Sequence, residues 1–132
     1  MQYTALGRTE LQVSRVGLGC GGPSRLGQSY GSSLEDSKRV IFRALELGIN
    51  LFDTAESYGT EAVLGSALRE ARASQRVVVS TKKSVWDWDA KRLCTPDEMA
   101  SGIDASLERL GRDRIEIFHL HGLGLEHAEY AL

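Results

Sequence analysis

Short apolar stretches alternate with longer segments of helical periodicity along most of this 132-residue chain. The apolar stretches run from Val16 to Gly19, Ile49 to Asp53, Val77 to Thr81 and Ile115 to Leu120, and such runs are typical of buried strands. In the intervening segments apolar residues recur every three to four positions, as on one face of a helix. Alternation of this kind predicts parallel strands joined by right-handed helical crossovers. We therefore expect an α/β protein with one parallel sheet.

Before the first of these strands, the chain is expected to form a β-hairpin. Tyr3 to Leu6 and Leu11 to Val13 are short apolar-bearing runs on either side of a four-residue segment that contains Gly7. A glycine in such a position supplies the turn between two antiparallel strands.

Three helices have start and stop signals. The first carries apolar residues from Leu34 to Leu45, with a capping box predicted at Ser32 and Glu35 and a C-terminal cap at Gly48. Thr60 precedes the second, in which Leu64, Ala67, Leu68 and Ala71 share a face. The third begins at Thr95 as N-cap, with Pro96 at the first helical position, Glu98 completing the capping box and Gly111 ending the helix. A fourth helical segment is expected from about Leu125.

Composition and charge exclude several classes of protein. Apolar residues make up 42% and charged residues 26% of the chain, and the net charge is −2. These values predict a soluble globular protein, with no nucleic acid or anionic membrane as partner. The N-terminus has no apolar signal core, and Cys20 and Cys94 form no paired motif. We therefore expect a cytoplasmic protein with two free thiols and no metal site.

Gly17, Gly19 and Gly22 have the G-x-G-x-x-G spacing of a dinucleotide-binding loop. In a Rossmann fold, however, the helix opens inside this motif and directs its N-terminus at the pyrophosphate. Here Pro23 follows directly, and no helix is expected before Ser32. The pattern therefore favours a loop at the end of a strand, where the backbone passes close to a ligand or to another strand.

Four ionisable side chains follow the carboxyl ends of three successive predicted strands. Asp53 ends one strand and Tyr58 lies in the loop after it, Lys82 ends the next strand, and His121 follows the last. In a parallel sheet these ends share one edge, where active sites form. A nearby ammonium group stabilises a phenolate, and a carboxylate can hold that ammonium in place. The set is therefore suited to giving a proton to a carbonyl oxygen, while a nicotinamide cofactor supplies the hydride that no side chain can donate.

The neighbours of these residues have simpler expected roles. His119 lies two residues before His121, and we expect it to be a hydrogen-bonded histidine one layer deeper on the same face. Lys83 should point to the face opposite that of Lys82. For Trp86 and Trp88, packing at the base of a loop is favoured over lining the substrate site.

Several motifs, in order and with natural spacing, resemble the aldo/keto reductase family over essentially the whole chain. "GINLFDTAESYGTEAVLGSALRE" resembles that family's signature, and "MQYTALGRTELQVSRVGLGCGG" resembles its N-terminal hairpin and first barrel strand. "VVVSTK" and "RIEIFHLHG" are similar to its third and fourth strands. The resemblance implies a (β/α)8 barrel of the TIM type.

The same resemblance implies a role for each candidate residue. Tyr58 would be the proton donor, Lys82 and Asp53 its tuning pair, and His121 the group that orients a small carbonyl substrate. Cys20, Gly21 and Asp53 would border the nicotinamide end of NADPH or NADH, with NADPH favoured.

A complete barrel of this type takes about 250 residues. Residues 1–132 are therefore expected to be its N-terminal half: a hairpin at 1–14, then βα units at 15–132 that stop within the fourth helix. Most of the cofactor site would lie beyond this segment. A fragment with little activity is favoured, and a non-catalytic half-barrel or regulatory binding module of the same family is the alternative. Two open sheet edges would favour self-association.

Overall fold

The computed structural model describes residues 1–122 and 124. A two-stranded antiparallel hairpin comes first, formed by β1 (Tyr3–Ala5) and β2 (Gln12–Ser14). The central sheet contains four parallel strands in the order β3 (Leu18–Gly19), β4 (Leu51–Asp53), β5 (Val78–Ser84) and β8 (Ile117–His121). The order of the strands in the sheet is their order in the chain, as expected for successive βα units.

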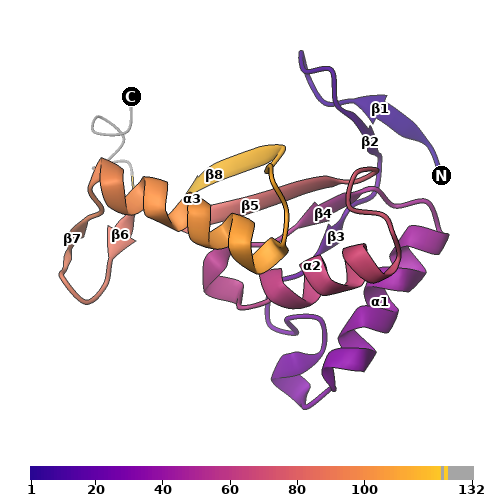
Figure 1. Cartoon of the computed structure of the whole chain (residues 1–132), viewed down its shortest axis with the longest axis horizontal. Coiled ribbons are helices and arrows are strands. Elements are labelled where there is room, and N and C mark those ends of the chain that lie inside the picture. Colours follow the sequence, from indigo (N-terminus) through magenta and orange to yellow (C-terminus); the bar gives the residue numbers. More distant parts are fainter. Residues whose placement is uncertain (123, 125–132) are drawn as a thin grey trace.

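Three helices connect the parallel strands: α1 (Leu34–Glu46), α2 (Glu61–Glu70) and α3 (Pro96–Leu110). They pack side by side on one face of the sheet, and the β1–β2 hairpin lies beyond one end of it (Figure 1). Two short 3₁₀ helices, η1 (Gln28–Tyr30) and η2 (Glu56–Tyr58), lie in the loops before α1 and α2. Among the described residues, no helix is long and apolar enough to cross a membrane.

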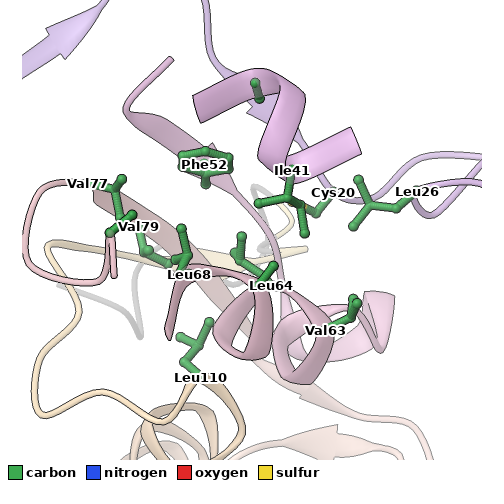
Figure 2. Packing of buried hydrophobic residues seen from close by; sticks show 13 residues of the cluster. Cys20, Leu26, Ile41, Phe52, Val63, Leu64, Leu68, Val77, Val79 and Leu110 are labelled. Carbon is green, nitrogen blue, oxygen red and sulfur yellow. The ribbon is translucent and has the colours of Figure 1, made fainter. Parts of the chain in front are cut away.

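The main core lies between the sheet and the helices. Phe52 of β4 and Val79 of β5 are fully buried and face Ile41 of α1 and Leu64 and Leu68 of α2 (Figure 2). Because every second residue of a strand faces the same side, one side of each strand packs against helices. The other side carries Leu51 and Val78 at the start of the strands and Asp53, Ser80 and Lys82 toward their carboxyl ends.

The start of α1 differs from the prediction by one residue. The capping box is formed by Ser33 and Asp36, so the predicted box at Ser32 and Glu35 is wrong. The Asp36 carboxylate accepts from the Ser33 backbone N–H at 3.1 Å, while the Ser33 hydroxyl accepts from the Asp36 N–H. Ser32 instead closes the preceding turn, since its N–H donates to Gly27 O. At the other end Leu47 is the C-cap, and Gly48 follows with a φ of +81°.

The ends of α2 and α3 are closer to the prediction. Thr95, Pro96 and Glu98 form the expected N-terminus of α3, and Gly111 ends the helix in the left-handed conformation. Thr60 precedes α2 as expected, but its side chain makes no capping bond. The Thr60 hydroxyl is buried against that of Thr54, 3.0 Å away.

Two strand regions differ from the expected ones. β8 begins at Ile117 instead of Ile115, because the Glu116 carboxylate accepts the Val79 N–H at 2.9 Å in place of a backbone carbonyl. The loop after β5 contains an unpredicted hairpin, β6 (Trp86–Asp87) paired with β7 (Arg92–Leu93). The helical segment expected from about Leu125 lies outside the described residues.

Candidate functional site

The Lys82 ammonium joins β5 to the end of β4. Its Nζ donates to Asp53 Oδ2 at 2.6 Å and to the Thr54 carbonyl at 2.8 Å. The strand register explains the reach, because Asp53 pairs with Ser80, and Lys82 lies two residues further on the same face. The second Asp53 oxygen accepts from the Ser80 hydroxyl at 2.8 Å. The Lys82 side chain is 16% exposed, so its charge is partly removed from water and held by these oxygens.

Tyr58 is carried to this ammonium by η2. The Lys82 Nζ lies 5.1 Å from the centroid of the Tyr58 ring, within cation–π range. On the other side, a Cβ on Gly21 would lie 2.4 Å from Cε2 of the Tyr58 ring, so only glycine allows the ring this position. The Arg25 Nε donates to the Tyr58 carbonyl at 2.5 Å. The loop after β3 therefore shapes the Tyr58 position.

His121 completes the group from the end of β8. Its ring meets the Tyr58 ring edge to face, with centroids 5.7 Å apart and planes at 88°. His119 lies two residues earlier on the same strand face, where it is exposed, and its Nε2 is 3.2 Å from the Ser80 hydroxyl. The expected hydrogen bond of His119 is therefore present, although the residue is exposed. The structure thus brings together all four side chains singled out in the sequence: Asp53, Tyr58, Lys82 and His121.

Cys20 lies beneath the site and is fully buried. Its N–H donates to the Asp53 carbonyl at 2.7 Å, which ties the loop after β3 to β4. Burial, with the Asp53 carboxylate as second cause, raises the pKa of the Cys20 thiol to about 12, while the Lys82 ammonium acts in the opposite direction. Cys20 is therefore a neutral thiol at physiological pH, next to the charged pair.

The loop after β3, residues 20–27, has room beside its backbone. No heavy atom lies within 4 Å of the position that a Cβ would take on Gly19 or Gly22. These glycines flank Cys20 and Gly21, at the end of a strand where a ligand could approach the main chain closely. The loop does not open a helix, since α1 begins only at Leu34. This agrees with the expectation that it is not a Rossmann loop.

A cavity of about 910 Å³ lies beside His121. Trp86 and Trp88 are among its lining residues, together with Lys83 and Glu56. Trp88 is 78% exposed, so the packing expected for it at the base of the loop is wrong. The reason is the β6–β7 hairpin, which carries this residue outward.

Three contributors to the site were missed in the sequence: Ser80, Glu56 and Arg25. Ser80 could have been found, because it lies two residues before Lys82 and so shares its strand face. Arg25 had no such signal, since its contact with Tyr58 depends on a loop in which Arg25 and Leu26 both have positive φ angles.

A chain with this geometry has many relatives. Residues 17–128 match the Aldo/keto reductase family. The chain is 37% identical to L-galactose dehydrogenase of Arabidopsis thaliana over 132 residues, which cover 93% of this chain and 39% of that protein. It is 32% identical to the NADH-specific methylglyoxal reductase of Escherichia coli, over 92% of this chain and 42% of that protein.

A solved structure shows the same fold. An aldo-keto reductase of Bacillus halodurans, in its holo form, superposes with a TM-score of 0.75 at 30% identity, covering 96% of this chain and 42% of that chain. The chain thus spans well under half the length of these relatives, and its parallel sheet and helices form part of their TIM-type barrel. The family match and this superposition agree with the resemblance carried by the sequence motifs: the chain belongs to the aldo/keto reductase family.

Proposed function

We propose that this chain carries the acid–base site of an NAD(P)H-dependent oxidoreductase that interconverts a small aldehyde or ketone and its alcohol. The observation that carries the proposal is the meeting of Tyr58, Lys82 and Asp53 with His121 at the carboxyl ends of β4, β5 and β8. The Arabidopsis and Escherichia coli relatives are named as a dehydrogenase and a reductase, which supports the same class of reaction.

In the proposed reduction, the Tyr58 hydroxyl gives its proton to the carbonyl oxygen. The phenolate left behind is stabilised by the Lys82 ammonium, which lies 5.1 Å from the ring centroid. Asp53 and the Thr54 carbonyl occupy two of the three Lys82 N–H donors and aim the ammonium at the ring. General acid catalysis of this kind typically contributes 10²–10⁴-fold to the rate.

His121 would orient the substrate. Its ring lies next to that of Tyr58, with a centroid distance of 5.7 Å, and we propose that the carbonyl oxygen accepts a hydrogen bond from the Tyr58 hydroxyl and from a His121 ring N–H. This double contact would hold the carbonyl in the direction needed for proton transfer.

Cys20, Gly21 and Asp53 are the residues of this chain that we propose to border the nicotinamide. The open space beside Gly19 and Gly22 fits the close approach of a flat ring to the backbone. A bound nicotinamide would supply the hydride. NADPH is the cofactor we favour from the family resemblance.

Titration of the ¹⁵N-labelled chain with NADPH or NADH tests the proposed site. We expect weak binding, with the largest changes in backbone NMR shifts at Cys20, Gly21 and the residues around Tyr58. The matched control is Tyr58→Phe, which keeps the ring and should bind the cofactor with the same affinity. Shift changes confined to other parts of the chain would overturn the cofactor assignment.

Steady-state reduction of small aldehydes and ketones tests the proton donor. In any form of the protein that turns over, Tyr58→Phe should lower turnover by about 10²–10⁴-fold. Turnover that does not depend on Tyr58 would overturn the assignment of Tyr58 as proton donor. Cofactor binding by a full-length form that shows no turnover would favour a binding module instead.

A further inference from the structure

Five consecutive residues of β5 hold the segment that carries Tyr58. Ser80, Thr81, Lys82, Lys83 and Ser84 all donate hydrogen bonds to residues between Asp53 and Glu61. Successive side chains do so from opposite faces of the strand, and Ser84 donates through its backbone N–H. Lys82 reaches Asp53 on the inner face, while Lys83 reaches Glu56 on the outer face.

On the outer face, both oxygens of the Glu56 carboxylate have hydrogen-bond donors. Lys83 Nζ lies 3.1 Å from Oε1 and 3.3 Å from Oε2, and the Ser84 backbone N–H donates to Oε1 at 3.0 Å. The side chains of Lys83 and Glu56 are only 17% and 22% exposed. A carboxylate with three such contacts is held more firmly than one in a typical surface ion pair.

Helix α3 provides the path that Lys83 takes to Glu56. A Cβ on Gly102 would lie 1.9 Å from Cδ and 2.4 Å from Cε of Lys83. The aliphatic part of Lys83 therefore passes over Gly102 of α3, where any residue larger than glycine would clash with it. The side chain is anchored by β5 at one end and by Glu56 at the other. Holding the Lys83 side chain in this path costs conformational entropy, which the contacts with Glu56 must offset.

Glu56 is the first residue of η2 and Tyr58 is the last. We propose that Lys83 and Glu56 are positioning residues, which hold η2 against β5 so that the Tyr58 ring stays between Lys82 and His121. The inference rests on the proposed function for the importance of Tyr58. The placement of its ring can be measured without cofactor or substrate.

The nuclear Overhauser effect between the ring protons of Tyr58 and His121 reports this placement, since their centroids are 5.7 Å apart. We expect Lys83→Met, which keeps the stem over Gly102, to lose this signal. Glu56→Ala, which removes the carboxylate that Lys83 Nζ and the Ser84 N–H contact, should lose it as well. Lys83→Arg restores a donor that reaches Glu56 and should keep it.

Lys38→Met is the matched control. Lys38 pairs with Glu35 at 3.1 Å and Glu70 at 3.2 Å, and its side chain is also 17% exposed, but it joins α1 to α2 away from Tyr58. Lys38→Met should keep the Tyr58–His121 signal. Circular dichroism of each variant establishes that it is folded.

The signal retained in both Lys83→Met and Glu56→Ala would overturn the proposal. So would its loss in Lys38→Met, because the effect would then come from general loosening. If either Lys83→Met or Glu56→Ala fails to fold, the other variant decides, and the proposal requires that it lose the signal. Absence of cofactor binding would count against the proposed function and leave the measured placement unchanged.

Discussion

The adjacent residues Lys82 and Lys83 have different partners because strand alternation sends them to opposite faces. Lys82 is held by Asp53 and the Thr54 carbonyl on the face that carries Tyr58 and His121. Lys83 is held by Glu56 beneath α3. Only Lys82 has its charge next to the phenol ring. Removal of each charge should therefore act on Tyr58 by a different route.

Lys82→Met should lower carbonyl reduction in the same direction as Tyr58→Phe. The physical reason is that the ammonium stabilises the phenolate formed when Tyr58 gives up its proton. If Lys82 acts mainly through Tyr58, the double variant should lose little more than Tyr58→Phe alone. Steady-state kinetics of both single variants and the double variant measure this. Fully additive losses would mean that Lys82 has a separate role.

The two cysteines should differ sharply in reactivity. The thiolate is the nucleophilic form, and the Cys20 thiol is fully buried with a pKa raised to about 12. Cys94 is partly exposed. At pH 8 a thiol reagent should modify one cysteine of the native chain quickly and the second only after denaturation. Cys94→Ser should remove the fast reaction, and a fast reaction that survives this change would contradict the burial of Cys20.

At the scale of elements, the contact between α2 and α3 depends on Gly65. A Cβ on this residue would lie 2.1 Å from the Leu110 carbonyl oxygen and 2.5 Å from its carbon. The clash is with backbone, which cannot turn away as a side chain can. Overpacking of this kind costs about 1–3 kcal/mol, more than the roughly 0.5–1 kcal/mol that alanine gains over glycine in a helix.

Gly65→Ala should therefore destabilise the chain, by about 2 kcal/mol in urea denaturation. Gly102→Ala is the comparison, because the three atoms nearest to its Cβ would all belong to the side chain of Lys83 and none to the backbone. Gly102→Ala should cost less stability than Gly65→Ala. Equal costs would show that the backbone contact of Gly65 is not the cause.

The N-terminus of α3 should weaken in acid. Hydrogen bonds from Arg92, and then from the Thr95 backbone, hold the pKa of Glu98 at about 2, below its usual 4.5. A carboxyl group whose pKa is lower in the folded than in the unfolded state stabilises the fold at pH values above its unfolded pKa. That contribution is lost as the pH falls toward the folded pKa. The melting temperature of Glu98→Gln should therefore approach that of the unaltered chain between pH 4.5 and pH 2.

Thr95→Ala serves as the control for this pH dependence. Its hydroxyl accepts the Glu98 N–H and does not titrate. Loss of such a cap costs about 1 kcal/mol, and that cost should persist across the same pH range. A gap between Glu98→Gln and the unaltered chain that stays constant with pH would contradict the assignment.

The sequence was most informative where one local rule decides the structure. Helical periodicity and Thr95-Pro96 located α3, and parallel strand ends brought Asp53, Lys82 and His121 to one edge. The α1 cap was misplaced because adjacent serines both had an acid three residues later. Contacts such as Gly21 against Tyr58 could not be predicted, since they join loops from two different βα units whose shapes depend on each other.

At the scale of the whole molecule, the four-stranded sheet has two outer strands, β3 and β8. In the part of the chain that the structure describes, β8 is paired along β5 only. An outer strand offers its unpaired N–H and C=O groups to another chain. Leu120 of β8 is 45% exposed, which adds apolar surface beside that edge.

The chain should therefore associate with itself in a concentration-dependent way, which sedimentation velocity can measure. Leu120→Lys should reduce association, because a lysine on an edge strand disfavours pairing with another chain. Val40→Lys is the matched control, since Val40 of α1 is 44% exposed and lies away from β8. It should associate as the unaltered chain does. A monomer at all concentrations, or equal loss of association in Val40→Lys, would show that the β8 edge is not the surface through which copies of this chain meet.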